Sequence, residues 1–144
     1  MRPRAVSRRS ASVALATAAL ALWPAEGGAN QEPSLSADAK CDPLPGPGKV
    51  RCAVRERAAG GKWTWGDVIV LSAPPFAPPL RTRLASGDAT QSGAEGADFA
   101  LALAATADGS GDLRVLARAV VCGESGCRPV HAEATAKVVV GSGQ

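Results

Sequence analysis

The sequence predicts an all-β domain built from antiparallel strands. Two observations favour this fold class. From residue 49 onward, apolar and polar residues alternate with a period of two, and segments rich in glycine or proline interrupt that alternation repeatedly. Alternation of this kind is typical of half-buried antiparallel strands, because successive side chains point to opposite faces of a sheet. We therefore expect sheets with one face toward a core and the other toward solvent.

The chain begins with a segment that we expect to be removed. Residues 1–29 contain four arginines, then an apolar run rich in Ala and Leu from Ser12 to Trp23, and then the small residues GGA. This order is typical of a secretory signal peptide, and the apolar run is too short to span a bilayer. We expect an exported protein, periplasmic or extracellular. A buried N-terminal helix is the alternative.

Removal of this segment leaves a domain of balanced charge. Four of the 16 Lys and Arg residues and one of the 13 Asp and Glu residues fall within it, so 12 of each sign remain. A neutral domain lacks the basic surface that binds nucleic acids or anionic membranes. A chain of about 115 residues suffices for one core. We expect a monomer with no nucleic-acid partner, no membrane span and no cofactor.

Residues 30–48 form a polar lead that ends in CDPLPGPG. Proline and glycine at this density indicate a loop and not a regular element. The β-sandwich domain is therefore expected to cover residues 49–144.

Two strands joined by a tight turn open that domain. Alternating apolar and charged residues predict a strand over 49–58, and a second is expected over 62–72. Between them, AAGGKW provides the two consecutive glycines that a two-residue hairpin favours. The segment APPFAPP then cannot be a central strand, because proline donates no ladder hydrogen bond. A short strand near 80–86 and a loop to residue 97 follow.

Three longer strands complete the pattern, over 98–107, 112–122 and 127–139. The first is rich in alanine and could instead be a helix, but the alternation in neighbouring segments favours a strand. The sequence ADGSGD turns the chain between the first and the second. Six or so strands in one neutral, exported domain predict an immunoglobulin-like antiparallel β-sandwich.

The last two strands contain a cysteine pair in VCGESGCRPV. If residues 123–126 form a hairpin loop, Cys122 lies opposite Cys127 and the apolar residues of both strands fall on one face. The cysteines then lie on the other face, in line with Arg118 and His131. Directly opposed residues without mutual hydrogen bonds are close enough for a disulfide. We expect this disulfide to be accessible to solvent.

Pro129 supports this register. It forms the next pair of the same kind with Val120, where the missing N–H would have pointed away from the partner strand. Proline is tolerated at such a position if that side of the strand is an edge of the sheet.

The other two cysteines differ. Cys52 shares its side of the first strand with Val50 and Val54, so its sulfur should point into the core, and its nearest candidate partner is Cys41. Closing a loop of about 12 residues stabilises the fold by roughly 3 kcal/mol. We interpret Cys41–Cys52 as a structural disulfide. Alternatively, Cys41 stays free or pairs elsewhere, since four cysteines allow three pairings.

The segment 113–140, with a strand, CGESGC, RP and another alternating strand, resembles the N-terminal periplasmic domain of the thiol:disulfide interchange protein DsbD. The resemblance implies an immunoglobulin-like domain in which Cys122 and Cys127 are the exchanging sulfurs and Pro129 is the motif proline. It implies a partner that is a thioredoxin-like periplasmic protein or a membrane thiol reductase. It also implies an aromatic cap over the cysteines, for which Phe76 is the candidate.

A rival interpretation is a disulfide-stapled sandwich that binds a protein or an envelope component without redox turnover. Arg128 would stabilise a neighbouring thiolate, but Glu124 would oppose it. The two charges therefore do not decide between exchange and a structural bridge.

The remaining candidate residues favour structural roles. His131, the single histidine, lies about 13 Å along the strand from Cys127 and is expected to be solvated. Trp63 and Trp65 should share one face of their strand and pack in the core, with a ligand platform as the alternative. No metal site is expected, because Cys52 points to the face opposite that of the last two cysteines and zinc requires convergent ligands.

Overall fold

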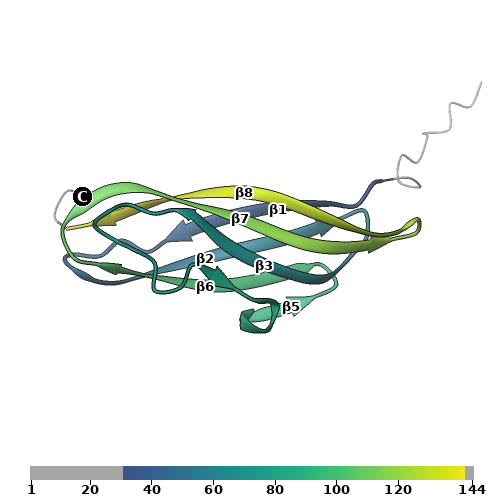
Figure 1. Cartoon of the computed structure of the whole chain (residues 1–144), viewed down its shortest axis with the longest axis horizontal. Coiled ribbons are helices and arrows are strands. Elements are labelled where there is room, and N and C mark those ends of the chain that lie inside the picture. The colour runs from purple at the N-terminus through teal and green to yellow at the C-terminus, as the bar shows by residue number, and fades with distance from the viewer. Residues whose placement is uncertain (1–30, 142–144) are drawn as a thin grey trace, which may run out of the picture.

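The structure, a computed structural model, describes residues 31–141 and shows two antiparallel β-sheets packed face to face (Figure 1). The expected all-β sandwich is confirmed. The predicted signal peptide over residues 1–29 lies outside the described residues. Between residues 31 and 141 the chain forms eight strands and one short 3-10 helix: β1 (Ser34–Cys41), β2 (Gly48–Ala59), β3 (Lys62–Ser72), β4 (Arg83–Leu84), η1 (Ser86–Asp88), β5 (Gln91–Gly93), β6 (Gly96–Ala105), β7 (Gly109–Gly123) and β8 (Gly126–Val140).

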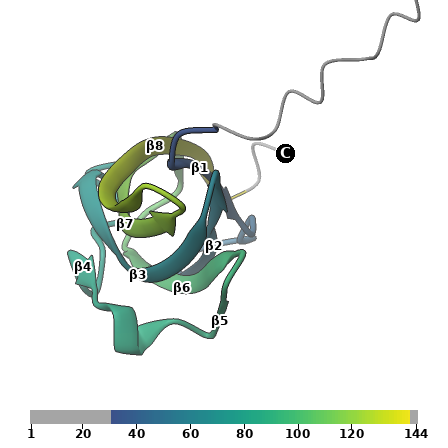
Figure 2. The ribbon, with the colours of Figure 1, turned by 90° about the vertical axis from the view of Figure 1, so that its right-hand side faces the viewer.

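The strand order is that of an immunoglobulin-like sandwich. One sheet has the order β1-β2-β6-β5 and the other β4-β3-β7-β8. If the strands are lettered along the chain, with β4 as C′, these sheets read ABED and C′CFG. Constant-type immunoglobulin domains place ABED against CFG, so this chain adds only the short edge strand β4. Figure 2 shows the two layers end on.

Aliphatic side chains from both layers fill the space between the sheets. Val50 and Leu103 face inward from one sheet, and Leu113 and Val138 face inward from the other; all four are fully buried. Each belongs to the inward half of an alternating strand, which is why the period of two predicts the core correctly.

The tight turn between β2 and β3 is also confirmed. Gly60 and Gly61 connect the strands, and Gly60 has φ +73°, a conformation that glycine adopts without strain. The alanine-rich segment is strand β6, and its side chains alternate between the core and the surface. The alternative of a helix there is therefore wrong.

The start of the domain differs from the prediction. A regular strand, β1, occupies Ser34–Cys41, where a loop was expected, and it pairs with β2 along its whole length. Leu35, Ala37 and Ala39 do alternate with polar residues and are half-buried. Because two of these three side chains are alanine, the apolar pattern is weak, and the strand depends on its partner for stability.

Two smaller differences lie between β3 and β6. The predicted strand near 80–86 is only the two-residue β4, and the predicted loop before residue 97 contains the short edge strand β5. In the part of the chain that the structure describes, no helix is long and apolar enough to cross a membrane.

Candidate functional site

Both predicted disulfides are present. Cys41 bonds to Cys52 and Cys122 bonds to Cys127, each with Cα atoms 3.9 Å apart. Each bridge joins residues that already face each other in neighbouring strands, β1 with β2 and β7 with β8. Two disulfides in a domain of this size are typical of an exported protein, since reducing compartments keep cysteine thiols reduced.

The predicted register of the β7–β8 hairpin is confirmed. Cys122 pairs with Cys127, Val120 with Pro129, Arg118 with His131, Ala119 with Val130, Ala117 with Ala132, Val115 with Ala134 and Leu113 with Ala136. The loop is shorter than expected, because Gly123 pairs with Gly126 and only Glu124 and Ser125 form the turn. The disulfide therefore lies at the tip of a long hairpin, at the right-hand end of the molecule in Figure 1.

The two bridges differ in their access to solvent. Cys127 is exposed and Cys122 is half-buried, on the outer face of their sheet. Cys41 and Cys52 are only 8% and 4% exposed, and both belong to the core. The expectations of one accessible and one inward-facing disulfide are thus confirmed, and only the hairpin bridge is open to a second molecule.

Pro129 lies on an edge strand of its sheet, as the predicted hairpin register requires. Strand β8 ends the order of its sheet, and Pro129 is exposed on it, opposite Val120. Proline therefore removes no hydrogen bond that a neighbouring strand would need on that side.

An open groove of about 860 Å³ adjoins the disulfide. Three segments form it: the residues that lead into β1, the β2–β3 turn and the tip of the β7–β8 hairpin. Its lining consists of Gln31, Glu32, Gly60, Gly61, Lys62, Cys122, Gly123, Glu124, Ser125 and Arg128. Cys122 thus has open space beside it.

The two hairpin tips meet through their backbones at this groove. A Cβ added to Gly61 would lie 2.6 Å from the carbonyl oxygen of Cys122, and one added to Gly123 would lie 2.5 Å from the carbonyl oxygen of Gly60. Glycine is therefore required at these positions by close approach, and the β2–β3 turn supports the strand that carries Cys122.

Charges of both signs surround the groove. Arg128 is exposed and lies 3.9 Å from Glu32 (Nη1 to Oε1), while Lys62 and Glu124 also line the groove. An exposed pair at this distance contributes little to stability. Lining residues of both signs thus surround the groove, and the opposed effects of Arg128 and Glu124 on a thiolate remain a prediction.

Phe76 does not cover the disulfide. Its ring lies against Gly109, where an added Cβ would be 2.7 Å from Cδ1, and its carbonyl oxygen accepts a hydrogen bond from the Thr106 amide at 2.8 Å. Gly109 and Cys122 lie near opposite ends of β7; 13 residues of strand span roughly 40 Å. The expectation of a Phe76 cap is therefore wrong: the proline-rich segment folds over the other end of the sandwich.

The two strand tryptophans do not share a face. Trp63 pairs with Val121 and Trp65 with Val120, so a β-bulge leaves Thr64 without a partner residue. Trp63 points into the core and is 8% exposed, whereas Trp65 is 38% exposed on the outer face. The prediction that both pack in the core holds for Trp63 and is wrong for Trp65.

The bulge also brings Thr64 to the disulfide. Thr64 Oγ1 donates a hydrogen bond of 2.9 Å to the carbonyl oxygen of Val120 and lies 3.8 Å from the Sγ atom of Cys122. Sequence alternation gave no sign of this contact, because the bulge shifts the register by one residue.

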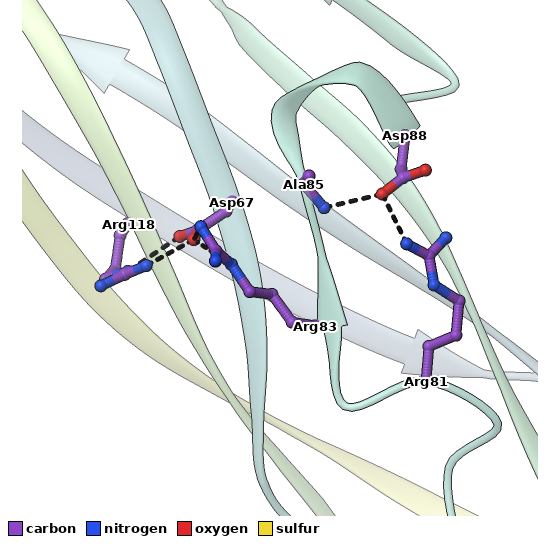
Figure 3. A network of polar contacts seen from close by, with 6 residues as sticks. All are labelled: Asp67, Arg81, Arg83, Ala85, Asp88 and Arg118. Atoms are coloured by element: carbon purple, nitrogen blue, oxygen red, sulfur yellow. Dashed lines mark hydrogen bonds and ion pairs between the residues drawn. The ribbon is translucent and has the colours of Figure 1, made fainter.

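A charged network borders this region on the outer face (Figure 3). Asp67 is fully buried beneath two arginines: Arg118 Nε donates to its Oδ1 at 2.8 Å and Arg83 Nε donates to its Oδ2 at 2.9 Å. The hydrogen bond from Arg118 is the main reason that the pKa of Asp67 is lowered. His131, paired with Arg118, is exposed as predicted.

A buried carboxyl group in the core was missed by the sequence analysis. Glu56 of β2 is fully buried; its Oε2 accepts a hydrogen bond from Trp63 Nε1 at 2.8 Å, and its Oε1 has no partner. Burial raises the pKa of Glu56 to about 7, partly offset by the Trp63 hydrogen bond. Its parity with Val50, Cys52 and Val54 could have revealed its inward position.

Within residues 31–141, no group of three or more His, Cys, Asp or Glu side chains is arranged to hold a metal ion. The site consists of the disulfide, its groove and the outer face of the sheet beside it.

No family model and no curated protein sequence matches this chain. Among solved structures, the chain is similar to AggA, the major subunit of aggregative adherence fimbriae type I from Escherichia coli, at 9% identity and a TM-score of 0.42, covering 76% of this chain and 96% of that one. It is also similar to the Vibrio cholerae VesB protease, at 12% identity and a TM-score of 0.33, covering 71% of this chain and 31% of that one. With TM-scores this low, the fold assignment rests on strand order and not on these similarities.

Proposed function

We propose that this protein is an exported thiol–disulfide exchange domain that acts in the periplasm through Cys122 and Cys127. The single observation that carries the proposal is the accessible disulfide at the hairpin tip, in a molecule whose other disulfide is buried. The resemblance of residues 113–140 to the DsbD N-terminal domain supports it. The partner is a thioredoxin-like protein or a membrane thiol reductase.

The exchange proceeds in two balanced steps. A thiolate of the partner attacks one sulfur of the Cys122–Cys127 bridge; that S–S bond breaks, a mixed disulfide forms, and the other cysteine leaves as a thiolate. The partner's second thiolate then attacks the mixed disulfide and releases the domain. The partner ends oxidised, with its own disulfide, and the domain ends reduced by two electrons, which it passes to another protein disulfide by the reverse steps.

Cys41–Cys52 remains closed in this scheme. Both of its sulfurs belong to the core, so a partner thiolate has no path to them without local unfolding. This bridge ties β1 to β2 and keeps the sandwich intact while the other bridge opens.

The second candidate function is a stapled sandwich that binds a protein or an envelope component. It is favoured by the fact that both bridges join residues already paired within a sheet, which a purely structural staple would also do. The reduction potential of the hairpin bridge separates the two functions.

The experiment equilibrates the exported protein in thiol–disulfide buffers of graded potential and maps each bridge by alkylation and mass spectrometry. Under the exchange proposal, Cys122–Cys127 opens near roughly −200 mV, while a resistant structural bond stays closed to below about −300 mV. Cys41–Cys52 in the same molecule is the matched control. If both bridges resist reduction equally, the exchange proposal is wrong.

A further inference from the structure

An apolar row lies directly beside the accessible disulfide. Trp65, Val120 and Pro129 are paired across β3, β7 and β8, and we call these three residues the apolar row. Trp65 and Pro129 are exposed and Val120 is half-buried. Val120 and Pro129 each lie two residues from a cysteine of the bridge, on the same face, which is roughly 7 Å along a strand.

The β-bulge at Thr64 places the tryptophan in this row. With regular alternation, Trp65 would have pointed inward together with Trp63; the extra residue turns it outward instead. Bulges are frequent beside functional sites, where they redirect a side chain. The exposed tryptophan beside the accessible bridge is thus a local departure from the regular alternation of β3, which has a second irregularity between Val70 and Ser72 near its far end.

The position of the apolar row beside the disulfide indicates which molecule would bind it. A partner thiolate that reaches Cys127 from the outer face brings its own surface against the residues next to the bridge, which include the members of the apolar row as well as Lys62 and Thr64. Exposed aromatic residues surrounded by polar groups are typical centres of protein interfaces. The Asp67–Arg83–Arg118 network forms the polar border on the side away from the cysteines.

We propose that the apolar row is the docking surface for a protein thiol partner whose reactive cysteine is flanked by apolar surface. This inference rests on the proposed exchange function and assigns the partner's contact site. Burial of Trp65 in the complex favours capture of a protein thiol, while a small thiol, which needs no docking, gains nothing from the row.

The test compares two reductants of the same bridge. Reduced thioredoxin is the protein probe and dithiothreitol is the small one, and each second-order rate constant is measured on wild type, Trp65→Thr and Leu71→Thr. Leu71, also exposed on β3, is the matched control. It lies near the far end of the strand, nine residues beyond Lys62, which lines the groove beside the disulfide. Trp65→Thr should lower the thioredoxin rate constant about tenfold or more and leave the dithiothreitol rate within about twofold. Leu71→Thr should change neither rate constant.

Pro129→Ser provides a second variant in the row, and circular dichroism checks that each variant is folded. An unchanged thioredoxin rate in both row variants would overturn the docking surface. So would an equal loss with both reductants, which would mean that Trp65 acts on the bridge itself. A rise in the thioredoxin rate, together with loss of a wild-type dimer, would assign the row to self-association instead. If neither reductant opens the wild-type bridge in folded protein, the exchange function fails and the docking surface fails with it.

Discussion

Replacement of Glu56 by glutamine isolates the effect of the buried carboxyl group on stability. Glu56 lies between the sheets with one oxygen bonded to the Trp63 indole and the other without a partner. Glutamine has nearly the same shape, can accept the same indole hydrogen bond through its amide oxygen, and does not ionise. The two proteins should therefore differ chiefly in how their stability depends on pH.

The size of that difference follows from the pKa of Glu56, which burial raises from 4.5 to about 7. Between these values the folded protein keeps a proton that the unfolded chain has released, so the stability of the wild type is full below the ordinary pKa and falls as pH rises toward the folded one. Since one pKa unit corresponds to about 1.4 kcal/mol, the loss is about 3 kcal/mol. A loss of this size is a substantial part of the stability of a small domain.

The assay is urea unfolding of both proteins with their disulfides intact, in buffers from about pH 4 to about pH 8. The free energy of unfolding of the wild type, relative to Glu56→Gln, should fall by about 3 kcal/mol across this range. The Asp67 network is common to both proteins, so its own pH dependence cancels in the difference. Parallel stability curves for the two proteins would refute the assignment of a protonated, buried Glu56.

Three further changes have defined outcomes. Gly66→Ala should destabilise the fold by about 1–3 kcal/mol in urea unfolding, because the new Cβ would contact Glu56 Oε2 and lie 2.8 Å from the carbonyl oxygen of Arg118; an unchanged midpoint would contradict this packing. Gly61→Ala should lower Tm, because its Cβ would meet the carbonyl oxygen of Cys122, while Gly46→Ala, with nothing within 4 Å, should not; equal shifts would argue against contact between the hairpin tips. Replacement of Cys41 and Cys52 by serine should cost about 3 kcal/mol or more, and the same change at Cys122 and Cys127 should cost less, because those side chains are exposed; the reverse order would contradict the assigned roles.

Much of the fold could be predicted because alternation and short turns are local properties. The Gly-Gly turn and the alternation around it place β2 and β3, and the inward parity of Val50, Cys52 and Val54 places Cys52 in the core. In the last hairpin, a slip of one residue would turn one apolar set outward, and the register that keeps both sets on one side also brings Cys122 to Cys127. Each of these inferences uses residues that are neighbours in sequence or across a short turn.

The errors share a physical cause, which is dependence on a partner distant in sequence. Strand β1 contains mostly small side chains, and its pairing with β2 is what makes it a strand. Phe76 lies in a segment that packs against Gly109, at the end of the sandwich away from Cys122 and Cys127. The alternation in β1 is too weak to report its pairing, and no periodicity reports the contact of Phe76 with Gly109.

The local sequence thus predicts the longer strands from β2 onward, the last hairpin and its disulfide, because backbone alternation and short-range pairing suffice to specify them. Tertiary structure alone decides that a bulge at Thr64 separates Trp63 from Trp65, and that the carboxyl group of Glu56 accepts a hydrogen bond from the Trp63 indole and has a raised pKa. A bulge is a mismatch between two strands, and a raised pKa is a consequence of burial between two layers. Both are properties of the assembled sandwich and not of the local sequence.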